Sequence, residues 1–207
     1  MGDKIHTTVA VGGFSSEVGK TTLVCELLRH LPGWEAIKLT RGHYRSCGKD
    51  PHACCVSHLL GDEPLVRSGR RETYAPGKDT GRYWDAGASN VHWVIVTDAQ
   101  VEQGIRLALG RVRAPGVLIE GNSFLRFVDV DFAVMVARPG VKIKPSARRA
   151  LKVCSALYLS GDADGTAASG RSTARLLDTA DQDTLAALPV YTRADLPSLI
   201  ARIRTLP

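Results

Sequence analysis

A glycine-rich segment near the start of the chain, GFSSEVGKTT at residues 13–22, has the composition of a turn that wraps around phosphate groups. In such a turn the backbone N–H groups point at an anion, the lysine reaches the β- and γ-phosphates, and the next hydroxyl can bind Mg²⁺. Five residues separate Gly13 from Gly19, so the loop is one residue longer than the usual pattern. The residues predicted to bind nucleotide are Gly13, Ser15, Ser16, Glu17, Val18, Gly19, Lys20, Thr21 and Thr22.

The residues on either side of this loop indicate a strand before it and a helix after it. Thr7–Val11 is apolar and β-branched, as in a buried strand, and leucines recur at helical spacing in Lys20–Leu31. A glycine-rich turn with an incidental lysine would explain the glycines. It would not explain Lys20 and Thr21 together at the start of a helix.

Two charged residues end otherwise apolar strands. Burying the ammonium group of Lys38 is costly unless an anion meets it, which favours a ligand phosphate or carboxylate at this position. The alternative is a lysine that extends from the edge of the sheet into solvent. Glu120 can supply an oxygen ligand to a hard cation beside the phosphate loop, or it can cap a turn.

Five potential metal ligands lie within thirteen residues, namely His43, Cys47, His52, Cys54 and Cys55. Thiolates and imidazoles are ligands that Zn²⁺ prefers, and thiolates also hold iron–sulfur clusters. The spacing is not that of paired CxxC motifs. Three interpretations therefore stay open: a Zn²⁺ or iron–sulfur site within one chain or across a dimer, ordinary loop thiols, and a redox pair.

Strands and helices alternate along the whole chain, which predicts an α/β fold: a doubly wound, mostly parallel sheet with helices on both faces. About fifty residues, roughly 40–90, separate the second strand from the third, so we expect a single domain over 1–207 with a long inserted loop region there. The expected strands are Thr7–Val11, Ala36–Leu39, Val91–Val96, Val117–Ile119, Phe132–Val136 and Ala156–Leu159. The expected helices are Lys20–Leu31, Gln100–Leu109, Ser146–Val153, Thr173–Thr179 and Leu196–Thr205, with a further one at Thr80–Ala88.

The overall charge is positive, with a formal net charge of +6 over 207 residues, which suits an anionic ligand. The basic residues are scattered, so nucleic acid is not predicted as a partner. No segment has the run of about 18 apolar residues that a membrane span needs, and no export signal opens the chain. We expect a cytoplasmic protein that does not bind a membrane.

The phosphate loop, which ends Glu17-Val18-Gly19-Lys20-Thr21, is similar to that of dethiobiotin synthetases. Other stretches resemble the B-type accessory protein of molybdopterin-guanine dinucleotide biosynthesis: the strand that ends in Lys38, the segment KDTGRYWDAGA that begins at Lys78, and the strand that ends Ile119-Glu120-Gly121. Both families are P-loop NTPases, and the resemblance covers about residues 7–121.

This resemblance implies a nucleotide at the carboxyl ends of the strands and Mg²⁺ shared by Thr21, Asp79 and Glu120. Asp79 can also be the N-cap of the helix at Thr80–Ala88, and the two roles are compatible. A triphosphate needs a hard cation held by oxygen ligands, which agrees with this set. It makes Lys20, Asp79 and Glu120 the expected catalytic residues, and we expect Lys38, Lys78 and Arg82 to meet a substrate or phosphate. The kinship also implies a homodimer.

The leading hypothesis from the sequence is Mg²⁺-dependent binding and hydrolysis of ATP or GTP, coupled to the handling of a cofactor or metal. The second ligand would be an anionic small molecule or cofactor. One alternative is a ligase or kinase that transfers the γ-phosphate to a small molecule, as in dethiobiotin synthetase. The other is a nucleotide-gated metal carrier or sensor that uses the cysteine and histidine segment.

Overall fold

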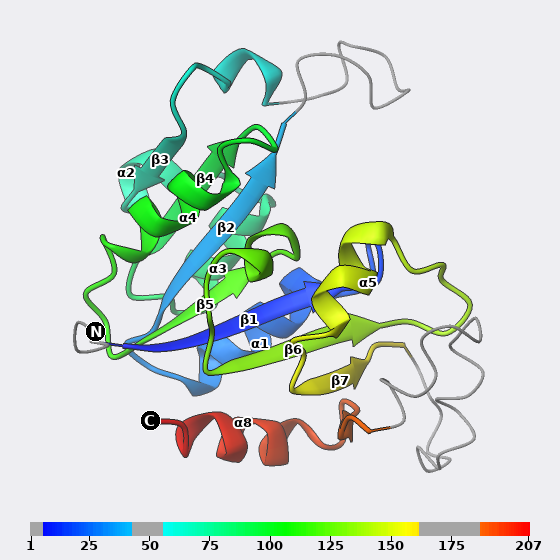
Figure 1. Cartoon of the computed structure of the whole chain (residues 1–207). Helices are drawn as coiled ribbons and strands as arrows, with labels where there is room; N and C mark the ends of the chain where they lie inside the picture. Colours follow the sequence, from blue (N-terminus) through cyan, green and yellow to red (C-terminus); the bar gives the residue numbers. More distant parts are fainter. Residues whose placement is uncertain (1–5, 43–55, 162–186) are drawn as a thin grey trace.

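The computed structural model describes residues 6–42, 56–161 and 187–207, which contain one sheet with the strand order β3-β4-β2-β5-β1-β6-β7-β8. All neighbouring strands run parallel except β3, which is antiparallel to β4 at one edge. The strand β1 lies in the middle of the sheet (Figure 1). The strands are β1 Thr7–Gly13, β2 Glu35–Arg41, β3 Leu65–Ser68, β4 Val91–Val96, β5 Gly116–Glu120, β6 Phe132–Ala137, β7 Ala156–Leu159 and β8 Val190–Tyr191.

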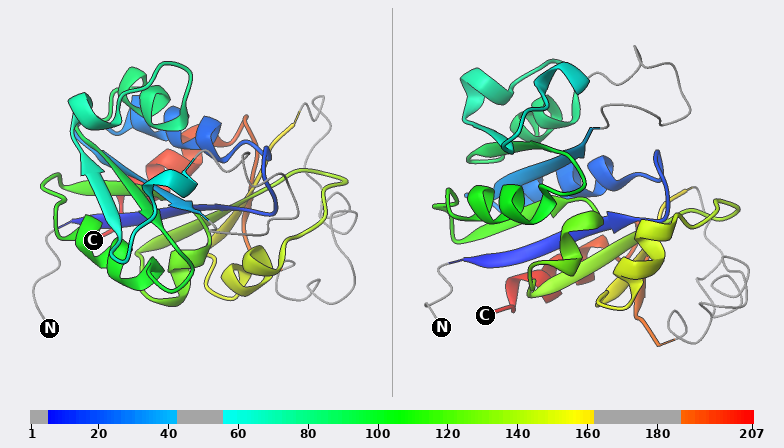
Figure 2. Two further views of the ribbon diagram at one scale, coloured as in Figure 1. Left: turned by 90° about the horizontal axis from the view of Figure 1, so that it is seen from above. Right: turned by 45° about the horizontal axis from the view of Figure 1, so that its top comes forward.

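Helices cover both faces of the sheet (Figure 2). The helices α1 and α8 lie on one side, and α4 and α5 lie on the other. The helices are α1 Lys20–His30, α2 Arg70–Thr73, α3 Asp79–Asp85, α4 Val101–Leu109, α5 Pro145–Leu151 and α8 Leu196–Arg204, with short 3₁₀ turns η1 Ser57–Leu59 and η2 Ser123–Arg126.

The core consists of two apolar layers separated by the sheet. Side chains alternate between the layers along a strand, so Val134 and Val136 of β6 face α1 and α8 while Ala133 and Met135 face α4 and α5. Because the inner strands are buried on both faces, they read as continuous apolar runs, as in other parallel sheets. The doubly wound α/β fold predicted from the sequence is confirmed.

All six predicted strands are present, and four of the predicted helices lie within two residues of α1, α4, α5 and α8. The helix expected at 80–88 is instead α3, which begins at Asp79 and ends at Asp85, because Gly87 has a φ of 96° that stops it. The short elements β3, α2 and β8 were not predicted. The helix expected at 173–179 lies outside the described residues.

The carboxyl ends of β1, β2, β5 and β6 reach the same edge of the sheet, since these strands are parallel. The register sets which residues meet near this edge: Glu120 of β5 lies beside Val11 of β1 on one side and beside Lys38 of β2 on the other. Lys38 does not end its strand as predicted, because pairing with β4 continues β2 to Arg41. The loop between β1 and α1 extends over this edge.

Candidate functional site

The loop between β1 and α1 is anchored by apolar side chains on both faces of the sheet. Phe14 is fully buried in the layer under α4 and α5, and Val18 is buried in the layer under α1. Between them the backbone turns sharply: Glu17 has a φ of 58° and Gly19 has a φ of 97°. Gly19 is the N-cap residue of α1, so the sharp turn of the loop leads directly into the first turn of that helix.

Gly13 permits a close approach that another residue would block. A Cβ atom at Gly13 would lie 2.8 Å from the Lys20 side chain. The Asn122 side chain, which follows β5, fixes the same glycine by accepting from its N–H and donating to its carbonyl, both at 2.8 Å. Sequence reasoning missed Asn122, although its position two residues after Glu120 at a strand end was a usable signal.

Lys20 folds back over the loop that carries it. Its Nζ donates to the backbone carbonyl of Ser15 at 2.8 Å. Burial lowers the pKa of Lys20, and the neighbouring ammonium groups of Lys38 and Lys144 add to this effect against the opposing charge of Glu120. An anion bound over the loop would relieve this unfavourable environment.

Lys38 lies between two carboxylates. Its Nζ is 2.5 Å from Asp79 of α3 and 2.5 Å from Glu120. Burial disfavours the ammonium form, but Glu120 and Asp79 outweigh that effect and raise the pKa of Lys38. Burial likewise opposes ionisation of Asp79, yet the hydrogen bond and charge of Lys38 lower the pKa of this carboxyl.

Glu120 is the most buried of these charged groups, with its side chain 2% exposed. Its Oε2 accepts from the Thr21 hydroxyl at 2.8 Å and from the Tyr83 hydroxyl of α3. Burial and the Glu120 charge together raise the pKa of Tyr83 well above its usual range, so the phenol stays protonated and donates. The sequence interpretation did not include Tyr83, although it is four residues after Asp79 and therefore on the same face of the helix.

These groups line one cavity of about 500 Å³, which we call the phosphate cavity. The loop and the first turn of α1 contribute Ser16, Glu17, Gly19, Lys20, Thr21 and Thr22. Other elements contribute Lys38, Asp79, Arg82 and Glu120.

The other residues predicted at the site lie around this cavity or away from it. Gly13 and Ser15 line an adjoining hollow, and Val18 lines a hollow towards β7. Lys78 is exposed and lines none of these cavities. The five cysteine and histidine residues predicted as Zn²⁺ or iron–sulfur ligands fall in 43–55, outside the described residues.

The donors around Thr21 suit a hard cation. A hydroxyl and two carboxylates are oxygen ligands of the kind that Mg²⁺ binds, and Mg²⁺ completes its shell with phosphate oxygens and water. In the described part of the chain no three histidine, cysteine or acidic side chains form a group that could hold a metal by themselves. Thr21, Asp79 and Glu120 would therefore hold the ion together with a bound phosphate, and Lys38 would have to move away from the carboxylates.

A second hollow of about 400 Å³, the β7 cavity, opens on the other side of Gly19. Leu23 and Leu196 give it an apolar wall, and Tyr158, Ser160 and Arg193 give it polar groups. The Ser160 hydroxyl donates to the carbonyl of Val18 and so ties the end of β7 to the loop.

The described helices include none that is both long and apolar enough to cross a bilayer.

Neither the protein-family models nor the curated proteins gave a match to this chain. Among solved structures, the chain is similar to LpxK from Aquifex aeolicus in complex with ATP, with 16% identity, a TM-score of 0.50, and coverage of 90% of this chain and 53% of that one. It also matches the signal recognition particle 54 kDa protein from Aeropyrum pernix in complex with GDP, with 13% identity, a TM-score of 0.47, and coverage of 99% and 50%. The chain spans about half the length of both proteins. The sheet order, the loop between β1 and α1, and the likeness to LpxK identify the fold as that of P-loop NTPases.

Proposed function

We propose that this protein binds ATP or GTP with Mg²⁺ in the phosphate cavity and hydrolyses it, coupled to the handling of a cofactor or metal. One observation carries the proposal: Lys20 and Thr21 from the loop meet Glu120 and Asp79 from two other elements around a single cavity. A phosphate-binding loop alone would account for Lys20. The two carboxylates beside the Thr21 hydroxyl add what a metal-bound triphosphate needs.

Each group has a role in this proposal. Backbone N–H groups of the loop and the Lys20 ammonium hold the phosphates and stabilise charge that develops on the transferred phosphoryl group. Mg²⁺ held by Thr21, Asp79 and Glu120 would neutralise negative charge on the terminal phosphates. Lys38 and Arg82 supply further positive charge at the same cavity.

The nucleoside fits the β7 cavity, which adjoins the loop at Gly19 and Thr22. Its apolar wall can contact a base, and Ser160 and Arg193 can hydrogen bond to it. The Asn-Lys-x-Asp motif that recognises guanine has no clear copy after β7. The proposal therefore names both ATP and GTP as the nucleotide.

The test compares wild type with Lys20→Ala and with the control Lys142→Ala, which removes an exposed lysine outside these cavities. Wild type should bind ATP or GTP only weakly without Mg²⁺ and should release phosphate with it. Lys20→Ala should reduce turnover by at least a hundredfold, since it removes a charged donor to the transferred group, as other oxyanion-stabilising donors contribute about 10²–10³. Equal turnover in the Lys20→Ala variant and wild type would refute the proposal.

Transfer of the γ-phosphoryl group to a small molecule is the second candidate function. It is favoured by a hollow of about 260 Å³, lined by Ser15, Ser16 and Lys20, that continues from the loop away from the nucleoside. Phosphorus NMR separates the two functions, because hydrolysis gives inorganic phosphate whatever is added, whereas transfer gives a new phosphorylated product only with an acceptor.

A further inference from the structure

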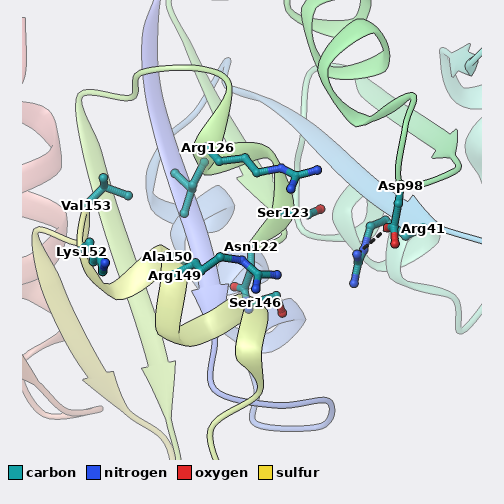
Figure 3. A pocket seen from close by; sticks show the side chains of 11 residues that line it. Arg41, Asp98, Asn122, Ser123, Arg126, Ser146, Arg149, Ala150, Lys152 and Val153 are labelled. Atoms are coloured by element: carbon teal, nitrogen blue, oxygen red, sulfur yellow. Dashed lines mark hydrogen bonds and ion pairs between the residues drawn. The ribbon is translucent and has the colours of Figure 1, made fainter. Parts of the chain in front are cut away.

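A cavity of about 330 Å³ lies on the α4 and α5 side of the sheet, at the carboxyl ends of β2, β4 and β5. We call it the basic cavity. Figure 3 shows the side chains of Arg126 from η2 and Arg149 from α5 extending towards the end of β2, where Arg41 is paired with Asp98. These elements are far apart in the sequence, so no local charge pattern revealed the cluster.

The lining of the basic cavity carries a large excess of positive charge. Four cationic side chains, Arg41, Arg126, Arg149 and Lys152, line it together with a single acidic one, Asp98. Asp98 is already neutralised, because its Oδ1 lies 2.5 Å from Arg41. Among the described residues no carboxylate pairs with the other three cations. The Arg126 guanidinium also lies over the Phe127 ring, 4.3 Å from its centroid, a contact that does not neutralise its charge. Such a concentration of positive charge without carboxylate partners attracts an anion.

An intermediate hollow lies beside both the basic cavity and the phosphate cavity and shares lining residues with each of them. The intermediate hollow beside the loop shares Arg41, Asn122, Ser123 and Ser146 with the basic cavity. It shares Ser16 and Lys20 with the phosphate cavity. A small molecule held at Arg126 and Arg149 could therefore extend along this hollow to Lys20, where the γ-phosphate of a bound nucleotide would lie.

The side chains of the basic cavity favour a particular kind of anion. Arg126 and Arg149 offer forked donors, which match the oxygens of a phosphate group, and their two positive charges suit a dianion. Leu125, Ala150 and Val153 give the cavity an apolar side. A volume of about 330 Å³ suits a small molecule better than an extended nucleic acid.

We infer that the basic cavity binds the phosphate group of a second substrate, a small phosphomonoester with an apolar portion, and orients it towards the γ-phosphate of the nucleotide. This inference rests on the proposed binding of nucleotide in the phosphate cavity, and it gives the acceptor for the second candidate function, transfer of the γ-phosphoryl group to a small molecule. Arg126 and Arg149 hold the phosphate, and Arg41, held by Asp98, lines both the basic cavity and the hollow beside the loop. All of these groups bind or position the substrate.

The test uses phenyl phosphate as the probe, on protein saturated with Mg²⁺ and a non-hydrolysable ATP analogue so that the probe cannot occupy the phosphate loop. Calorimetry at fixed ionic strength compares wild type with Arg126→Gln, Arg149→Gln and the double variant. The control is the double variant Arg71→Gln/Arg202→Gln, which removes the same charge from exposed arginines outside the described cavities. Arg126 and Arg149 are themselves exposed, so their replacement should leave the fold intact, as a thermal unfolding curve verifies.

Wild type and control should bind phenyl phosphate saturably and with equal affinity. Each single variant should weaken binding about tenfold or more, and the double variant further, because a charge-assisted contact is lost each time. Nucleotide affinity should stay the same in all of them. Absence of saturable probe binding in wild type, or equal probe affinity in wild type and the double variant, overturns the inference.

Two further probes define the ligand. Benzoate has the same ring with a carboxylate, and it should bind at least tenfold more weakly than phenyl phosphate; equal affinity overturns the assignment to phosphate. A twelve-nucleotide single strand should not displace phenyl phosphate, and displacement that depends on Arg126 would point to nucleic acid instead. A wild type that binds no nucleotide refutes the proposed function as well, whereas nucleotide binding without a role for Arg126 and Arg149 refutes only this inference.

Discussion

Replacing Lys38 with methionine tests the charge arrangement at the centre of the site. Methionine keeps most of the apolar stem of the side chain and removes the ammonium group that lies 2.5 Å from both Asp79 and Glu120. The Glu120 side chain, which is only 2% exposed, would then face a second carboxylate without an intervening cation. The nucleotide-free protein should therefore lose stability.

The expected loss can be estimated from the burial of the three groups. Breaking a buried ion pair by removing one partner costs about 3–5 kcal/mol. The Asp79 side chain is 40% exposed, so water screens its share and the lower end of that range, about 3 kcal/mol, applies. For a chain of this size, about 2–4 °C is lost per kcal/mol, which gives a decrease in Tm of about 6–12 °C.

The loss should depend on pH in a defined way. The folded protein holds the pKa of Asp79 below its usual value of 3.8, so the stability that this contact contributes is complete above that value and is lost as the pH falls through the lowered pKa. The pKa of Lys38 is raised above 10.5, so its contribution is complete below that value and is lost only as the pH rises through the raised pKa. The difference between wild type and Lys38→Met should thus be constant from about pH 5 to 9 and shrink below about pH 4.

The assay is thermal unfolding of nucleotide-free protein followed by circular dichroism, with Lys142→Met as the control for loss of an exposed lysine. Millimolar Mg²⁺ should stabilise Lys38→Met more than wild type, because the ammonium group no longer competes with it for the carboxylates. A Lys38→Met variant that unfolds within about 2 °C of wild type at neutral pH would refute the reasoning, since that is less than the effect of 1 kcal/mol.

Two further substitutions test the supports of the site. Tyr83→Phe removes one of the two hydroxyls that donate to Glu120 Oε2 and should reduce the free energy of unfolding in urea by about 1.5–3 kcal/mol, the contribution of a hydrogen bond to a charged group; unchanged stability would contradict the hydrogen bond. Asn122→Ala removes both hydrogen bonds to Gly13 and should cost about 2 kcal/mol and weaken nucleotide binding in calorimetry, whereas nucleotide affinity equal to that of wild type would show that the loop does not depend on this clamp.

The sheet was predictable because its inner strands are short apolar runs between turn residues. Val91–Val96 and Ala156–Leu159 have the same bounds in the sequence interpretation and in the structure. The edge strand β3 was not predictable in this way. Its residues, Leu65–Ser68, form four positions with mixed polarity, and only pairing with β4 makes them a strand.

The loop between β1 and α1 was also predicted from the sequence, since the residues that suggest phosphate binding are contiguous. The supports of the site were harder to find. Asn122 contacts a residue 109 positions away and Lys144 contacts Ser16 from 128 positions away, so neither belongs to a local pattern. The meeting of Lys38 and Glu120 follows from the adjacency of β2 and β5, a feature of topology that strand propensities do not contain.

The contacts of the two lysines suggest how the site distinguishes its empty and occupied states. Lys20 donates to a neutral carbonyl, that of Ser15, and Lys38 donates to two carboxylates. A bound phosphate offers Lys20 a charged acceptor, and charge-assisted hydrogen bonds are roughly twice as strong as neutral ones, so Lys20 gains on exchange. If Lys38 turned to the phosphate, it would lose two carboxylate contacts that are as strong as the new one. The exchange is favourable only if Mg²⁺ then binds the two carboxylates. If the phosphate cavity binds a triphosphate as proposed, this arrangement favours joint binding of metal and triphosphate over binding of the nucleotide alone.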